Sequence, residues 1–205
     1  MSAAGRARWA VVFEVRPEPA RMDEYLGIAA DLRPALESIT GFLENERFRS
    51  LDRPGVLLSL SLWESEAGIV RWRTMERHRL AQQAGRDGIF LDYRLRVGPC
   101  TTAMPAAGDG QARFLALFTG ATAGASTRPE ARLPQPVPMT HERFEHLAEP
   151  ERQLALAAWP DARSAARHMA GHGAGSAIAG GLFVRVERDY GMRDRAQAPQ
   201  HYPPR

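Results

Sequence analysis

Lysine is absent from this sequence. All 27 basic residues are arginine, and they are interspersed with 24 acidic residues, which leaves a formal net charge of +3. A nucleic-acid-binding surface normally gathers its positive residues in one patch, and no basic block is found here. We therefore interpret the arginine usage as compositional bias and expect no nucleic-acid partner.

Cysteine and long apolar runs are equally scarce. Cys100 is the single cysteine, so an internal disulfide is excluded, and its place beside Pro99 at a segment end predicts an ordinary thiol. No apolar run approaches the roughly 20 residues that cross a bilayer, and the N-terminal MSAAGRARW has no hydrophobic segment typical of a secretory signal. These absences predict a cytoplasmic protein with no membrane partner.

Regular periodicity, by contrast, is well developed in residues 9–98. Alternating apolar side chains predict strands, and three-and-four spacing predicts helices with Pro34 late in the first and Gly85 and Gly88 ending the second. The strands are expected at 9–16, 42–50, 56–63 and 89–97, and the helices at 21–39 and 66–84. This order is that of a ferredoxin-like unit, an antiparallel four-stranded sheet with two helices on one face.

A degenerate copy of this unit follows a short linker. The small residues of 99–111 predict the linker, 112–190 the second unit, and 191–205 a polar tail. WESEAGIVRW at 63–72 parallels WPDARSAARH at 159–168, so Trp159 corresponds to Trp63 and His168 to Trp72. The copy's strands are expected at 113–119, 142–148, 153–159 and 181–190, whereas 120–140 lacks apolar periodicity and predicts the loss of its first helix.

The repeat has a consequence for the fold class, which we predict to be α+β. Two four-stranded sheets can pack face to face and close into a barrel, each burying the face that its helices leave bare. One chain would then supply both halves of a pseudo-dimeric α+β barrel. We expect a monomer of this kind or a homodimer of it.

Two segments carry a family resemblance. The element order, LSLSLWESEAGIVRW at 58–72 and HRLAQQAGRDGIFLDYRLRV at 78–97 resemble the antibiotic biosynthesis monooxygenase family of the dimeric α+β barrel superfamily. The resemblance implies a monooxygenase that lets dioxygen react directly with an aromatic or quinol-like small molecule, without a metal or flavin. The substrate would lie in a pocket between the sheet and its helices.

The resemblance also implies site residues: an asparagine, a tryptophan on the second helix, and a histidine or arginine after it. Trp72 matches the helix tryptophan. In the haem-degrading branch the axial histidine lies about three turns further on, where this chain has Gln82, and that branch's strand-one asparagine has no counterpart in WAVVFEVR at 9–16. The match to the haem-degrading branch fails at both positions. Haem binding or degradation is kept only as the alternative function.

Two candidate residues lie on the second predicted helix. Trp72 can stack on a planar substrate or simply pack in the core. His78 can deprotonate a phenol, because its pKa lies nearest the working pH, or can be a solvated surface residue. The two are rotated by about 240° on a straight helix, so they share a face only if the helix bends.

Three further candidates lie outside that helix. Asn45 on a strand can donate to a substrate oxygen or be exposed. Arg86 can hold an oxyanion as a catalytic group, or form a salt link to Asp87 or Asp92. Tyr93 is expected to pack inside, where its hydroxyl can donate to a substrate.

Metal binding and a non-catalytic role complete the alternatives. His168 and His172 have a spacing that can bind a metal, but no third ligand at a suggestive spacing supports a site. We therefore expect no metal. In the non-catalytic reading, the chain is a small-molecule-binding module whose second unit merely completes the barrel.

Overall fold

The computed structural model describes residues 8–102, 113–121, 139–170 and 181–199. In the first half, the strands are β1 (Arg8–Pro17), β2 (Phe42–Ser50), β3 (Leu57–Trp63) and β4 (Phe90–Thr101). The helices are α1 (Met22–Glu37), α2 (Glu66–Thr74) and α3 (Glu76–Ala84), with short turns η1 (Pro19–Arg21) and η2 (Gly85–Ile89). The predicted order of elements is confirmed, except that two helices replace the single one expected at 66–84.

In the second half, the described elements are β5 (Phe114–Ala121), β6 (Thr140–His146), β7 (Arg152–Trp159), α4 (Ala162–Ala170), β8 (Gly181–Arg185) and β9 (Arg188–Gly191). The lost helix predicted for 120–140 falls largely outside the described residues. The single strand predicted at 181–190 is wrong, because the chain turns between β8 and β9 and the two strands pair with different partners.

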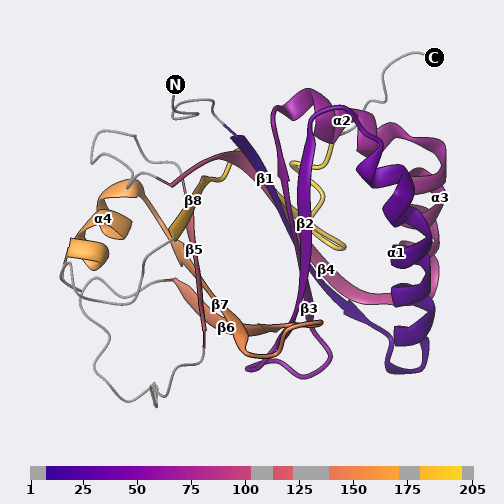
Figure 1. Ribbon diagram of the computed structural model, residues 1–205, viewed down its shortest axis with the longest axis horizontal. Coiled ribbons are helices and arrows are strands. Elements are labelled where there is room, and N and C mark those ends of the chain that lie inside the picture. Colours follow the sequence, from indigo (N-terminus) through magenta and orange to yellow (C-terminus); the bar gives the residue numbers. More distant parts are fainter. Residues whose placement is uncertain (1–7, 103–112, 122–138, 171–180, 200–205) are drawn as a thin grey trace.

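The strands close into a barrel, as the fold-class prediction requires. Within the described residues they form one nine-stranded sheet in the order β1-β3-β2-β6-β7-β5-β8-β4-β9, and β4 also pairs with β1. The two halves join edge to edge where β2 meets β6 and β4 meets β8. One chain thus supplies both four-stranded sheets of a pseudo-dimeric α+β barrel (Figure 1).

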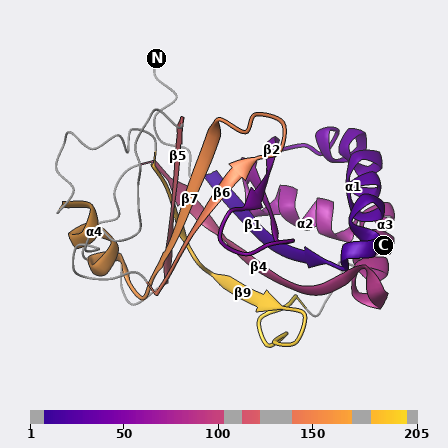
Figure 2. The same cartoon turned by 90° about the horizontal axis from the view of Figure 1, so that it is seen from below.

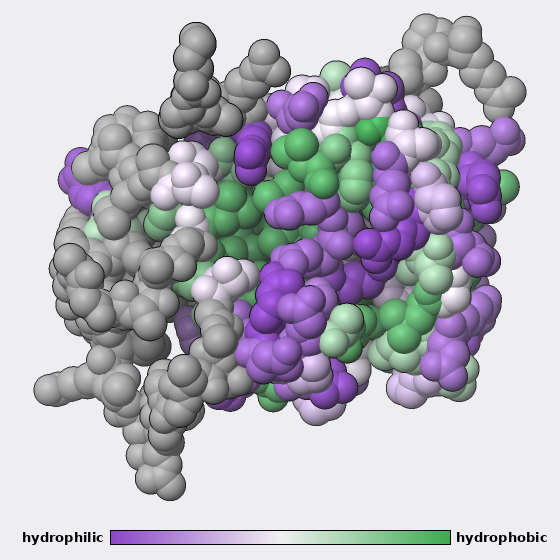
Figure 3. Space-filling view, viewed as in Figure 1, coloured by the Kyte–Doolittle hydropathy of each residue, from purple (hydrophilic) through white to green (hydrophobic). Residues whose placement is uncertain are grey.

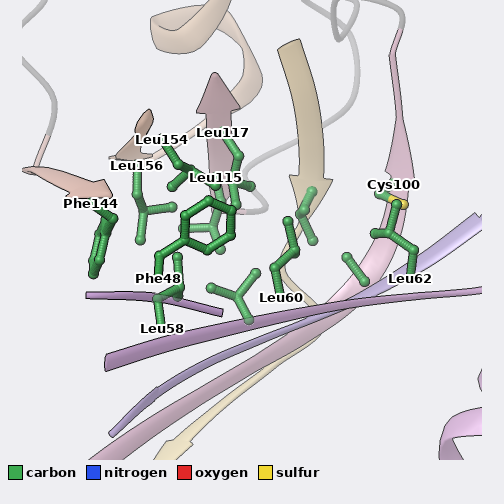
Figure 4. Packing of buried hydrophobic residues seen from close by; sticks show 13 residues of the cluster. Phe48, Leu58, Leu60, Leu62, Cys100, Leu115, Leu117, Phe144, Leu154 and Leu156 are labelled. Atoms are coloured by element: carbon green, nitrogen blue, oxygen red, sulfur yellow. The ribbon is translucent and has the colours of Figure 1, made fainter. Parts of the chain in front are cut away.

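The barrel interior is an apolar core built from both halves. Because side chains alternate along each strand, every second residue of β1, β2 and β3 points inward. Phe48, Leu58 and Leu60 from the first sheet face Leu115, Leu154 and Leu156 from the second (Figure 4). Hydrophobic side chains reach the surface between the two halves, next to a hydrophilic area (Figure 3). Neither sheet could bury this face alone, so the two halves depend on each other for stability.

Helices cover the outside of the barrel. α1, α2 and α3 lie against the first sheet and α4 against the second (Figure 1). Under the first three helices the outer sheet face carries two clusters, one around Tyr25 and Tyr93 and the other around Trp63 and Ile69. No helix in the described ranges is long and apolar enough to span a membrane.

The predicted linker begins too early. β4 continues through Pro99 and Cys100, because their positions still pair with β1 and Cys100 also pairs with Val184 of β8. Residues 103–111 of that linker lie outside the described residues. Burial raises the pKa of the Cys100 thiol to about 11, which agrees with the expectation of an unreactive thiol.

The end of the second half crosses back to the first. β9 pairs with β4 rather than with a strand of its own half (Figure 2), so the predicted boundary at 190 does not separate two packing units. Gly98 permits the crossing: a Cβ there would lie 1.8 Å from the carbonyl oxygen of Arg185, next to the bond from the Glu187 amide to the Val97 carbonyl (2.9 Å).

We expect Gly98→Ala to destabilise the fold by about 1–3 kcal/mol, because the added methyl must push two backbones apart. Urea denaturation measures the change. The matched control is Gly27→Ala on the exposed face of α1, where nothing lies within 4 Å of the new Cβ. That variant should gain up to about 1 kcal/mol of helix propensity. Equal effects at the two positions would contradict the tight crossing.

Candidate active site

A cavity of about 320 Å³ lies between the first sheet and α1, α2 and α3. Its volume is at the lower end of pockets that hold small molecules. The half of its floor made by β1 and β4 is apolar, since Val11, Phe13, Leu95 and Val97 point outward from the barrel into it. The half made by β2 and β3 is polar, and this division of the floor can orient a substrate that has one polar end.

The polar half consists of two cross-strand pairs. Asn45 lies opposite Ser61, and Arg47 lies opposite Ser59. The Asn45 amide nitrogen donates to Ser59 Oγ (2.8 Å) and to the Leu60 carbonyl (3.1 Å). Asn45 therefore lines the cavity as predicted, but its N–H groups are already used, so the predicted donation to a substrate has no free hydrogen. The hydroxyl hydrogen of Ser59 remains to be donated instead.

Trp72 and His78 come together because the helix breaks between them. Met75 has an extended backbone (ψ 132°) between α2 and α3. Thr74 Oγ1 donates to the Val70 carbonyl (2.8 Å), a bond that favours bending. The break reorients α3, so the indole and imidazole rings stack with centroids 4.0 Å apart and planes 16° from parallel. Trp72 and His78 thus share one face because the helix bends at Met75, as the sequence required.

The same break determines which imidazole nitrogen is protonated. The end of α2 leaves carbonyls without helical partners, and His78 Nδ1 lies 2.9 Å from the Trp72 carbonyl oxygen. A carbonyl accepts, so Nδ1 carries the hydrogen and Nε2 holds the lone pair. Burial lowers the pKa of His78 to about 4, although the bond to Trp72 acts the other way. His78 is thus a neutral imidazole at neutral pH with a basic Nε2.

Gln82 supports this arrangement from one turn further along α3. Its amide nitrogen donates to the Arg73 carbonyl (3.2 Å) and lies 3.2 Å from His78 Nδ1. Gln82 therefore gives a hydrogen-bond donor to the Arg73 carbonyl, another carbonyl that the end of α2 leaves without a helical partner. The residue that the haem-degrading branch would use as a ligand here stabilises the junction of the two helices.

Arg86 and Tyr93 also line the cavity. Neither Asp87 nor Asp92 forms a salt bridge with Arg86 among those found in the described residues, so the salt link considered for Arg86 is absent there. Tyr93 is buried, as predicted, and its hydroxyl accepts from Arg195 Nη1 at 2.5 Å. That bond leaves the Tyr93 hydrogen free to be donated.

The C-terminal segment completes the cavity wall, which sequence reasoning missed. Arg188, Tyr190, Arg195 and Pro199 line the cavity, and Arg188 forms an ion pair with Glu66 of α2 (2.5 Å). The polar tail predicted for 191–205 therefore contributes Arg195 and Pro199 to the cavity wall. No local pattern predicts that it contacts the other half.

All five predicted site residues, Asn45, Trp72, His78, Arg86 and Tyr93, therefore lie around one cavity. Arg47, Ser59 and Ser61 were missed, although their alternation with apolar residues in ENERF and LSLSL was a usable signal. His172 and the side chain of His168 lie outside the described residues. Within the described ranges, no three His, Cys, Asp or Glu side chains gather as a metal site.

Comparison with known proteins identifies the family. Residues 9–84 match the model of the antibiotic biosynthesis monooxygenase family. The jasmonate monooxygenase ABM of Pyricularia oryzae is 38% identical over 220 residues, an alignment that spans 96% of this chain and 99% of that protein. The chain belongs to the antibiotic biosynthesis monooxygenase family. The resemblance expected from residues 58–97 is confirmed, and monooxygenase activity on a small molecule is the function that the family supports.

Solved structures resemble one half of the chain. A family member from Caulobacter crescentus is 19% identical, with a TM-score of 0.42, over 45% of this chain and 88% of its own. A cofactor-independent oxygenase from Streptomyces nogalater is 14% identical, with a TM-score of 0.41, over 50% of this chain and 99% of its own.

The residues present do not fit the haem site of the haem-degrading branch. Axial haem ligands in proteins are imidazole, thiolate, thioether or phenolate groups, and Gln82 offers a primary amide that is bonded to the Arg73 carbonyl.

Proposed function

We propose that this monooxygenase oxidises a small aromatic or quinol-like molecule in the cavity beside Trp72, with no bound cofactor. The observation that carries the proposal is His78, a neutral imidazole stacked on Trp72 at the wall of the cavity. With Nδ1 bonded to a backbone carbonyl, Nε2 can accept a proton from a weakly acidic substrate. Removal of that proton makes the substrate electron-rich enough to react with dioxygen.

The chemistry balances for a substrate with an acidic CH₂ group beside an aromatic carbonyl. His78 takes one proton, and the carbanion adds to dioxygen to give a peroxide anion. The carbon then loses its second hydrogen as a proton while the O–O bond breaks, which gives a carbonyl and a hydroxide ion that carries this proton. The imidazolium returns the first proton to the hydroxide and forms water. The CH₂ carbon supplies all four electrons, so no external reductant is needed.

The other cavity residues would hold the charge and the ring. Arg86 can stabilise the substrate anion, because a fixed cation favours the negative charge that develops there. The Trp72 indole stacks with the base and limits how it can move. Tyr93 can donate its hydrogen to a substrate oxygen from the β4 side of the floor.

A jasmonate-like molecule is the second candidate, and the name of the Pyricularia oryzae relative favours it. Jasmonate is a cyclopentanone with a carboxylate. Insertion of one oxygen atom into a C–H bond of such a molecule consumes two electrons that it does not supply. This candidate therefore requires a two-electron reductant, such as a reduced nicotinamide or flavin.

Oxygen uptake with a panel of anthrones, hydroquinones and jasmonate, each with and without NADPH, tests the proposal. We expect uptake with an anthrone or hydroquinone and no reductant, and at least a tenfold lower rate for Trp72→Phe because the base loses its indole partner. Uptake only when both jasmonate and NADPH are present would favour the second candidate. Absence of uptake throughout would leave a non-catalytic binding module, and a Soret shift on addition of haemin would revive the haem alternative.

A further inference from the structure

The cavity is lined with positive charge. Five arginines and one carboxylate are among the described residues that line it: Arg47, Arg73, Arg86, Arg188, Arg195 and Glu66. The carboxylate is already paired, since Glu66 binds Arg188 at 2.5 Å. Guanidinium groups do not deprotonate in proteins, so the imbalance persists at every pH at which the protein is folded. An electrostatic field of this sign favours an anionic ligand.

Among the residues that the structure describes, Arg47 is a cavity guanidinium without a carboxylate partner and with a buried N–H group that no acceptor binds. Arg47 lines the cavity from β2, and it forms no ion pair with a carboxylate in the described part of the chain. Its Nε is buried without a hydrogen-bond acceptor. Arg47 also forms a hydrogen bond with the Tyr25 hydroxyl. Burial raises the pKa of Tyr25, and the Arg47 charge opposes that rise. A half-buried cation without a carboxylate partner is costly unless a ligand supplies the opposite charge.

The neighbours of Arg47 fit a carboxylate. Ser59 lies directly opposite on β3, and its Oγ accepts from Asn45, so its hydrogen is free to be donated. A guanidinium fork and a hydroxyl, side by side on one sheet face, match the two oxygens of a carboxylate. Beyond them the floor over β1 and β4 is apolar. If Arg47 and Ser59 bind the carboxylate of a ligand, the apolar part of the ligand lies against Val11 and Leu95.

We propose that Arg47 and Ser59 bind the carboxylate of the substrate, so that the substrate is an organic acid with an apolar or aromatic body. The inference rests on the proposed function for the identity of the cavity as the substrate site. Beyond the proposed function, it states which end of the substrate is recognised, the carboxylate, and which residue recognises it, Arg47. Arg86 remains the candidate for the oxyanion that forms during the reaction.

Binding of matched acids and esters tests the proposal without any oxygen chemistry. The probes are jasmonic acid with its methyl ester, and anthraquinone-2-carboxylic acid with its methyl ester. Calorimetry and thermal shift are the readouts. We expect at least one acid to bind about 10- to 100-fold more tightly than its ester, because an ionic hydrogen bond is lost in the ester. The acid should raise the melting temperature of the full chain, and the ester much less.

Variants assign the preference to Arg47. Arg47→Met should reduce the preference for acid over ester to less than about threefold, whereas Arg47→Lys should keep part of it because the point charge remains. The control Arg33→Met removes the same charge from the exposed face of α1 and should keep the full preference. Without ligand, Arg47→Met should melt no lower than the wild type, since it removes an uncompensated charge, whereas a purely structural arginine would lower the melting temperature.

The results that overturn the proposal are distinct from a failure of the proposed function. Equal affinity for acids and esters, no binding of either acid, or an unchanged preference in Arg47→Met would each contradict a carboxylate site. His78→Gln lacks the base but keeps Arg47, so it should bind the acids with the wild-type preference. A chain that binds acids in this way but consumes no oxygen would retain this inference and lose the proposed oxygenation.

Discussion

Replacing His78 by glutamine should lower kcat by about 10²–10⁴-fold, the usual contribution of a general base. The glutamine amide can still donate to the Trp72 carbonyl and so support the end of α2, but it cannot accept a proton. Oxygen consumption with the best substrate of the panel measures the loss. The matched control is His141→Gln at an exposed position of β6, which should retain the wild-type rate. An active His78→Gln enzyme would remove His78 from the chemistry.

The pH dependence gives an independent check of the same residue. Because burial lowers the pKa of His78 to about 4, the basic form persists well below the usual range of histidine. We expect kcat/KM to stay level from pH 8 to about pH 5 and to fall with an inflection near 4. An inflection near 6.5, the unperturbed value, would mean that the essential base is a solvated histidine.

The same lowered pKa has a consequence for stability. Between about pH 4 and 6.5 the unfolded chain binds a proton at His78 that the folded chain does not. The free energy of unfolding therefore decreases as the pH falls through this range and is at its highest above it. His78→Gln should lack this part of the pH dependence in urea denaturation.

Glu14→Ala should destabilise the protein by about 3–5 kcal/mol, the cost of leaving one member of a buried ion pair alone. Glu14 and Arg96 point into the barrel from β1 and β4, are 7% and 2% exposed, and form an ion pair. Arg96 binds Glu14 through Nη2, and its buried Nε has no acceptor within the described residues. Without Glu14 the Arg96 charge would stay buried without an ion-pair partner, because Asp189, which lies opposite on β9, is already paired with Arg94 and Arg113.

Two further variants separate charge from packing. Glu37→Ala breaks the exposed Arg33–Glu37 pair and should cost less than about 1 kcal/mol. The double variant Glu14→Leu with Arg96→Met replaces both charges by apolar groups and should recover most of the loss. Guanidinium chloride midpoints measure all three. A loss below about 1 kcal/mol in Glu14→Ala would mean that Asp189, which lies opposite Arg96 on β9, or water compensates Arg96.

Local periodicity predicted the strands well, because alternation follows from burial of one sheet face. The expected 42–50 strand coincides with β2, but alternation alone did not tell that the faces carrying Asn45 and Tyr93 lie outside the barrel, against the helices. The break at Met75 was not predicted, since ERHRLAQQA continues as a good helix on the far side and neither glycine nor proline marks the junction. The stacked pair of Trp72 and His78 depends on that break.

The sequence by itself determined the repeated ferredoxin-like order, the closed barrel and five residues of the cavity wall. These follow from side-chain alternation and from the need of each sheet to cover its bare face. Only the tertiary structure decided that the helix bends at Met75, that Arg47 lies in the cavity with a buried Nε, and that Arg195 reaches Tyr93 from the far end of the chain. Contacts between residues about a hundred positions apart depend on how the halves pack, and packing leaves no period in the sequence.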